Sequence, residues 1–153
     1  MRYIRKKIKK NSMFSVDHIH PMVVHFPIAL IFAGFLAEVV FLFFKKEPLL
    51  KEFHFWLVMI GSLSAFAAYF SGAFLTGTVP PEATLIHNRH ELFAELTVFA
   101  ALVNAALMVY LKLEKRDETN LKWLSFALNT LTVVLLFLTA HFGGVLVYDY
   151  LVK

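Results

Sequence analysis

The sequence predicts an all-α integral membrane protein, built as an up-down-up-down four-helix bundle. Of its 153 residues, 59% are hydrophobic and 17% are charged, whereas a soluble domain is usually about half apolar and about a quarter charged. The apolar residues form four long blocks, and each reaches the roughly 20 residues that a transmembrane helix needs. Connections between the blocks are short, which favours antiparallel packing of sequential neighbours.

Four spans are expected in order, and each must be helical because no other open segment satisfies its own backbone in lipid. The first stops at the charged turn 45–48, the second stops before Pro80-Pro81, and the third stops at the charged run 112–118. The fourth is long enough to tilt. The expected spans cover about residues 22–44, 55–75, 91–111 and 121–148.

The transmembrane domain is expected over residues 18–153, after a basic juxtamembrane segment over residues 1–17. Beside four apolar spans, membrane lipids with anionic headgroups are the expected partner of this segment, and nucleic acid is not. A polar, histidine-rich stretch follows the segment instead of an apolar run, so it is not the start of a signal peptide. One face would carry eight lysines and arginines and the other seven, which leaves the orientation open.

The chain contains no cysteine. This excludes disulfides, iron–sulfur clusters held by thiolates, covalent haem attachment and thiol catalysis. No activated serine arrangement is evident either. We therefore expect an electron carrier or a subunit more than a stand-alone enzyme.

Six of the seven histidines are expected near one face of the membrane, because odd and even spans run in opposite directions. Only His54 falls on the other side. Imidazoles gathered at one depth of an apolar bundle are a natural setting for iron or another metal. The six are His18, His20, His25, His87, His90 and His141.

The first motif runs from His20 to Pro27. Pro21 suits the first turn of a helix, and Pro27, one turn further in, frees the carbonyl near residue 23. His25 is expected below the interface, where a polar group needs a partner. It is either a ligand or an interfacial histidine bonded to a backbone carbonyl.

The second motif is His87-Asn88-Arg89-His90-Glu91, with Glu95 one turn on. His87 and Glu91 share a helix face if the helix starts early enough. The alternative is a charged helix start, in which Glu91 meets the helix dipole. Glu95 lies deeper in the predicted span, where an ionisable residue indicates function. It is expected to accept a hydrogen bond from a metal-binding histidine and so to fix the tautomer of that ring.

Small residues and one acid complete the candidates. Gly143 and Gly144, which follow His141, cost helix stability and indicate close approach of a neighbour or a cofactor. Pairs such as Gly61/Ala65 favour contact between helices over room for a flat ligand. Glu38, near the opposite face, is expected to reach the interface or a lysine, with a proton path as the lesser alternative.

Together these residues predict a b-type haem held between two histidines of facing helices, with phenylalanines covering the porphyrin. The axial candidates are first His25, His90 and His141, then His20 and His87. Arg89 would pair with the haem propionates. Glu91 and Glu95 would accept hydrogen bonds from the histidine ligands without binding the iron themselves. The rival is a metal-binding or transport-related membrane protein, in which the same histidines, with Glu91 or Glu95, make a compact site for copper, zinc or non-haem iron. A purely structural subunit is the third reading.

The opening HPMVVHFPIAL and the ending HFGGVLVY resemble a bacterial family of four-span membrane proteins known as domain of unknown function 2231. The resemblance covers about residues 18–150. It rests on His20, Pro21, Val24, His25, Phe26 and Pro27 in the opening, Arg89 and His90 before the third span, and Gly143, Gly144, Leu146, Val147 and Tyr148 in the ending.

This resemblance implies a multi-pass protein of the bacterial inner membrane. Some relatives are joined to c-type cytochrome or Rieske-like modules, which implies electron transfer at the membrane by association alone. Many relatives continue past the tyrosine with a glycine-rich tail, from which residues 149–152 depart. We therefore expect a haem-binding electron-transfer subunit of a larger redox or respiratory assembly, with a c-type cytochrome or a quinone as candidate partner.

Overall fold

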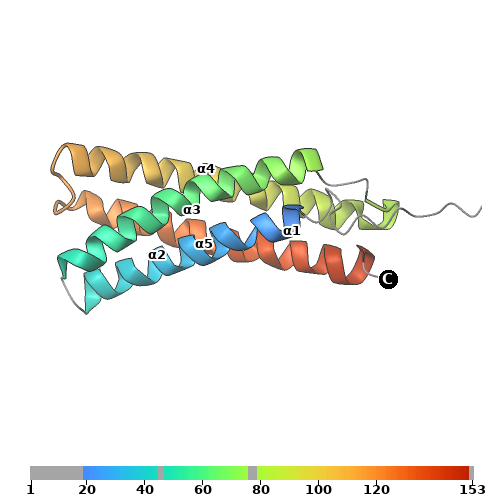
Figure 1. Ribbon diagram of the computed structural model, residues 1–153, viewed down its shortest axis with the longest axis horizontal. Coiled ribbons are helices and arrows are strands. Elements are labelled where there is room, and N and C mark those ends of the chain that lie inside the picture. Colours follow the sequence, from blue (N-terminus) through green and yellow to red (C-terminus); the bar gives the residue numbers. More distant parts are fainter. Residues whose placement is uncertain (1–18, 45–46, 76–78, 152–153) are drawn as a thin grey trace, which may run out of the picture.

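The computed structural model describes residues 19–44, 47–75 and 79–151, so the basic segment 1–17 and His18 lie outside the described residues. Within these ranges the chain is helical and has no strand. Figure 1 shows long helices lying side by side along one axis. The elements are α1 (Ile19–Val23), α2 (His25–Phe43), α3 (Pro48–Leu75), the 3-10 turn η2 (Pro81–Ala83), α4 (Thr84–Leu113), α5 (Leu121–Val145) and the π-helical end η3 (Leu146–Leu151).

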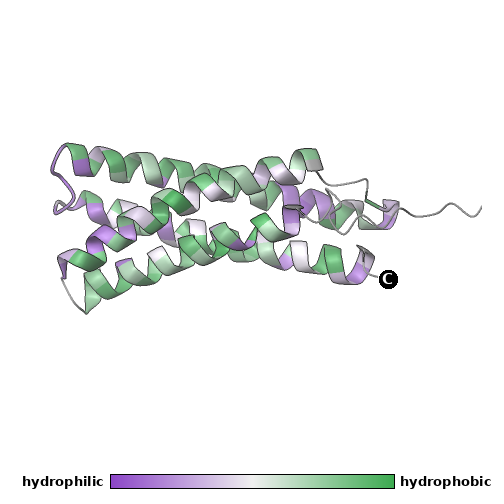
Figure 2. Cartoon of the chain, viewed as in Figure 1, coloured by the Kyte–Doolittle hydropathy of each residue, from purple (hydrophilic) through white to green (hydrophobic). Residues whose placement is uncertain are grey.

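Four segments are long and apolar enough to cross a membrane, which confirms the predicted fold class. The outer surface is rich in apolar side chains, such as Phe74 and Phe99 at 75% and 70% exposed. Polar residues gather toward the ends of the helices (Figure 2). This is the arrangement that lipid requires of a bundle. The four candidate spans are His20–Phe43, Pro48–Phe74, Pro81–Leu113 and Leu121–Tyr150.

Two helices begin earlier than the expected spans. α3 begins at Pro48 instead of near residue 55, and α4 begins at Thr84 instead of near residue 91. Proline is favoured in the first turn of a helix, where its missing N–H leaves no bond unmade. His87 and His90 therefore lie on turns of α4, and not before it.

The first span is broken at Val24, between α1 and α2. Pro27 has no N–H to donate to the carbonyl of Val23, and its ring crowds that carbonyl. The Val24 amide still bonds the His20 carbonyl at 3.1 Å. The break therefore lies where the sequence predicts a freed carbonyl, and it separates the turn that carries His20 from the rest of the span.

The helices pack as antiparallel neighbours, with α2 mainly on α3 and α4 mainly on α5. An apolar core joins all four at mid-height, with Ile31 from α2, Ala65 from α3, Ala101 from α4, and Val133 and Leu136 from α5. The two alanines among them, Ala65 and Ala101, let helix backbones approach closely.

Glycines set the distance between α2 and α3. A Cβ built on Gly61 would stand 2.7 Å from Ile31 Cγ1, and one on Gly34 would stand 3.0 Å from Val58 Cγ2. A distance of 2.7 Å is too short for a real Cβ atom, so Gly61 has no room for a side chain. At Gly34 the Val58 side chain would have to move to admit one. The prediction that Gly61 serves contact between helices is confirmed.

Candidate functional site

The bundle has two polar regions, one toward each end. The histidine end, where α1 and α4 begin and α3 and α5 finish, holds His20, Ser71, His90 and Thr139. The acid end, where α2 and α4 finish and α3 and α5 begin, holds Glu38, His54 and Asn129. Figure 1 shows these ends on the right and the left.

His20 is half-buried and faces α3. Its Nδ1 lies 2.8 Å from Ser71 Oγ, and Ser71 Oγ donates its own hydrogen to the Ala68 carbonyl at 2.7 Å. Ser71 must therefore accept from His20, so the ring hydrogen is on Nδ1 and the lone pair is on Nε2. The ring lies against Gly72, where a Cβ would be 3.0 Å from His20 Cε1.

His90 repeats this arrangement between α4 and α5. Its Nδ1 lies 3.0 Å from the Thr139 carbonyl, which accepts only, so Nδ1 again carries the hydrogen. Its ring lies against Gly143, where a Cβ would be 3.0 Å from His90 Cε1. The His20 and His90 rings are near enough to interact electrostatically. Within the described ranges neither Nε2 has a side-chain hydrogen-bond partner.

The other histidines of this end differ. His25 and His141 are exposed, and His25 Nδ1 donates to the Pro21 carbonyl of its own segment at 2.6 Å. That is the bond to a backbone carbonyl that the sequence left as the alternative for His25. His141 packs its ring edge-on against Phe142, with centroids 5.3 Å apart. Of the predicted axial candidates, only His20 and His90 combine inward placement with an opposing glycine.

The charged residues of the second motif lie outside this pair. His87 Nδ1 is 3.6 Å from Glu91 Oε2 one turn on, so the predicted shared face of these two is confirmed. Glu95 accepts from the Tyr69 hydroxyl at 3.0 Å, and the described contacts do not join it to a histidine. Arg89 is exposed, with its guanidinium carbon 5.9 Å from the centre of the Phe142 ring.

Among the described residues, no group of three or more histidine, aspartate and glutamate side chains is placed to hold a metal ion. A compact three-ligand centre therefore has no set of side chains within these ranges. Two inward histidines, His20 and His90, remain, each with Nδ1 bonded to an oxygen. A pair of that kind is the donor set that a haem iron takes in its two axial positions.

The acid end holds a hydrogen-bonded cluster from three helices. Glu38 and His54 are 4% and 7% exposed, and Asn129 is fully buried. Asn129 Nδ2 donates to Glu38 Oε2 at 2.7 Å, and His54 Nε2 lies 3.5 Å from Glu38 Oε1. His54 Nδ1 donates to the Gly34 carbonyl at 3.0 Å. Glu38 thus pairs with two buried side chains, and not with a lysine at the interface.

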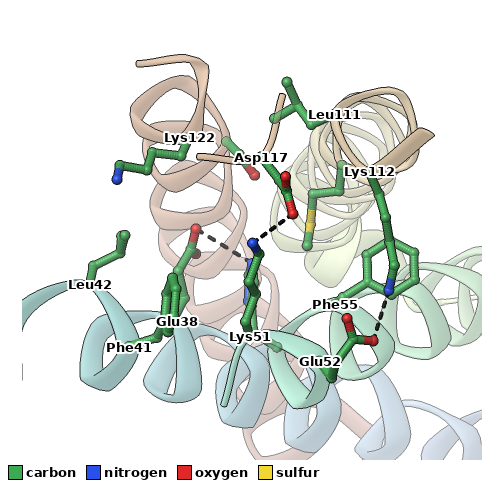
Figure 3. Close-up of a pocket in the computed structure, with 13 residues that line it drawn as sticks. Glu38, Phe41, Leu42, Lys51, Glu52, Phe55, Leu111, Lys112, Asp117 and Lys122 are labelled. Atoms are coloured by element: carbon green, nitrogen blue, oxygen red, sulfur yellow. Dashed lines mark hydrogen bonds and ion pairs between the residues drawn. The ribbon is translucent and has the colours of Figure 1, made fainter. Parts of the chain in front are cut away.

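A cavity of about 70 Å³ reaches Glu38 and His54 from this end of the bundle (Figure 3). Its mouth carries charges that are paired among themselves. Lys51 Nζ is 2.6 Å from Asp117 Oδ2, and Lys112 Nζ is 2.8 Å from Glu52 Oε2. Asp117 lies in the connection between α4 and α5, outside the spans, and its hydrogen bond from Lys51 holds the pKa of this carboxyl below its usual value.

The sequence analysis singled out Glu38 but missed its partners, because it set His54 apart from the other histidines and did not consider Asn129. The signal was present. Glu38 lies shortly before the turn that joins the first two spans, and His54 lies shortly after it. Antiparallel neighbours bring such positions to the same depth. A buried asparagine early in the last span completes a set that lipid tolerates only when its members are bonded to one another.

The fold and these two polar regions define a multi-pass, all-α membrane protein. A family model described as "Predicted membrane protein (DUF2231)" matches residues 17–153. The chain therefore belongs to this family, as its opening and ending motifs indicate. No curated protein and no solved structure matches it.

Proposed function

We propose that this chain is a haem-binding electron-transfer protein of the membrane, with His20 and His90 as the axial pair. One observation carries the proposal. Two inward histidines from different helices each have Nδ1 bonded to an oxygen acceptor and Nε2 left as a lone pair. Metal-binding histidines are usually held in this way, because the second-shell bond fixes both the tautomer and the orientation of the ring.

Glycines make room for the inward His20 and His90 rings, and aromatic side chains lie nearby. Each ring has a glycine beside it, at Gly72 and Gly143, where any larger residue would compete for the same space. Phe93 and Phe142 stack near His90 with centroids 5.3 Å apart and planes at 8°. Aromatic rings of this kind suit the apolar face of a porphyrin.

A b-type haem would supply reversible one-electron chemistry, and the chain would supply binding and orientation. His20 and His90 would hold the iron, while Arg89 at the outer edge offers a cation to a propionate. No soluble catalytic domain is evident in the chain, which favours a subunit that passes electrons to a partner. A c-type cytochrome or a quinone is the proposed partner class, and the bacterial inner membrane is the proposed location.

The experiment is an absorption spectrum of the purified full-length protein, produced with haem available and followed by metal analysis. A Soret band with sharp reduced α and β bands is expected. His20→Ala and His90→Ala should each abolish or displace these bands. His25→Ala and His141→Ala are matched controls that remove exposed histidines of the same end, and they should retain the spectrum.

Other outcomes of this experiment reject the proposal in different ways. A colourless protein with stoichiometric copper, zinc or iron would replace haem with a metal site. A colourless protein without metal would leave a structural subunit. Haem bands that survive in both His20→Ala and His90→Ala would move the ligands elsewhere in the chain.

A further inference from the structure

The buried pair at the acid end, Glu38 and His54, has no part in the haem proposal. His54 Nδ1 is committed as a donor, because the Gly34 carbonyl at 3.0 Å only accepts. A neutral His54 therefore turns the lone pair of Nε2 toward Glu38 Oε1, 3.5 Å away. If Glu38 were ionised as well, two acceptors would face each other with no hydrogen between them.

A single proton resolves this conflict. On Glu38 it gives a carboxylic acid that donates to His54 Nε2, and on Nε2 it gives an imidazolium that donates to a carboxylate. Both forms are electrically neutral as a pair. Without the proton, one uncompensated negative charge would remain in the interior of the bundle, which is costly.

Asn129 adds an independent sign that this pocket lacks a donor. Its Nδ2 donates to Glu38 Oε2 at 2.7 Å. Its Oδ1 is buried and has no hydrogen-bond partner within the described residues. Among the described residues the pocket therefore contains more acceptors than donors, and a proton on Glu38 or His54 would add a donor to it.

The charges around the cavity do not neutralise Glu38, because they are already paired with one another. From α3, Lys51 bonds Asp117 and Glu118 in the connection after α4. Lys112 of α4 bonds Glu52 of α3 at 2.8 Å. On α5, Lys122 lies 4.0 Å from Glu118. The described mouth thus holds three lysines and three acids, and the pair below it must balance its own charge.

We propose that Glu38 and His54 form a proton-binding site, which holds one proton between carboxylate and imidazole and exchanges it with water at the acid end through the cavity. The proton moves between Glu38 Oε1 and His54 Nε2, and it leaves as hydronium when the pair becomes anionic. This site is separate from the histidine pair proposed for haem, and its test does not depend on bound haem.

Protonation can be measured on the full-length protein in lipid nanodiscs near neutral pH. Infrared spectra should show a carboxylic acid band that is lost in Glu38→Gln and retained in the control Glu95→Gln. The equivalent result is a 15N imidazolium signal that is lost in His54→Asn. A carboxylate together with a neutral imidazole would overturn the proposal.

A chemical readout covers the case in which Glu38→Gln or His54→Asn fails to fold. A hydrophobic carbodiimide modifies protonated carboxyl groups in apolar surroundings, so it should label Glu38 of the wild-type protein in peptide mass spectra. Raising the pH should suppress this labelling. Labelling of exposed acids alone, without Glu38, would contradict a proton held as carboxylic acid and leave the imidazolium signal to decide.

Access of water to Glu38 through the cavity can be tested by thiol labelling. The chain has no cysteine of its own, so only an introduced cysteine would react. Met108 lines the cavity, and Thr97 is equally buried on the same helix toward the histidine end. A membrane-impermeant thiol reagent should modify Met108→Cys from one face only and should spare Thr97→Cys. Equal labelling of both, or labelling of neither, would remove the proposed route.

Discussion

The two ends of the bundle use imidazole in different ways. At both ends Nδ1 is fixed by an oxygen acceptor, so Nε2 is the nitrogen that meets the interior. At the acid end Nε2 of His54 faces a buried carboxylate. At the histidine end Nε2 of His20 and His90 meets no acceptor within the described ranges. The neighbour of Nε2 thus decides whether the same ring is suited to share a proton or to bind a metal.

The largest effect is expected from the bond that supports Glu38. Asn129→Leu keeps the bulk of the side chain but removes the donor to Glu38 Oε2, and it should destabilise the protein by about 2 kcal/mol. Denaturant unfolding in detergent, followed by circular dichroism, measures this loss. The matched control is Thr132→Val on the same helix, because within the described residues Thr132 bonds only the Leu128 carbonyl of its own helix. Equal losses in the two variants would mean that the Glu38 bond contributes nothing special.

Two neighbouring glycines at the histidine end separate the effect of packing against His90 from the effect of helix propensity. Gly143→Ala should push on the His90 ring, 3.0 Å from the new Cβ, and overpacking of this kind costs about 1–3 kcal/mol. Gly144→Ala meets no atom within 4 Å and should stabilise α5 by about 0.8 kcal/mol. Thermal unfolding of both variants measures the difference. If both stabilise alike, the His90 ring is not held against Gly143.

A smaller effect is expected from the acceptor of His20. Ser71→Ala removes the oxygen that receives the Nδ1 hydrogen, and the loss should be about 1 kcal/mol. Where haem is bound, the same change should also shift the reduction potential, because the second-shell bond tunes the ligand. Ser64→Ala is the control, since Ser64 bonds only the Gly61 carbonyl of its own helix. A potential that stays fixed in Ser71→Ala would argue against His20 as a ligand.

The smallest effect concerns pH and the mouth of the cavity. The Lys51 ammonium lowers the pKa of Asp117 in the folded protein. Stability from this pair is therefore present above the pKa of the unfolded chain, about 3.9, and is lost as pH falls through the lower folded value. In Asp117→Asn, acidification from about pH 7 to about pH 3 should lower Tm less than in the wild type. Glu114→Gln in the same connection should keep the wild-type profile.

The spans were predictable because hydropathy and length alone identify them, and connections too short for a crossover fix antiparallel neighbours. The first turns of α3 and α4 could not be predicted in the same way. They carry polar residues such as Glu52, His87 and Arg89, which resemble loop positions when only hydropathy is weighed. A helix end that meets headgroups and water keeps such residues without losing its backbone bonds.

The candidate sites were predictable only in part. The motifs identified His20 and His90 among the histidines of one end, but not their inward direction, which depends on the interruption at Val24 and on the early start of α4. The prediction that a neighbour approaches closely is confirmed at Gly143, which lies against the His90 ring, and is wrong at Gly144, which has no atom within 4 Å of a Cβ position. The tautomers were beyond reach, since they depend on Ser71 and Thr139, which lie far along the chain.

Gly34 shows how little chemistry is needed to set the character of an acidic site. Its carbonyl is the regular helical acceptor for the amide of Glu38, and it also receives His54 Nδ1. The absent side chain lets α3 come near enough for that second bond. Gly34 carries no functional group, yet its carbonyl decides which nitrogen of the His54 ring faces Glu38. A methyl group at this position would press on the Val58 side chain and thereby strain the bond that orients His54.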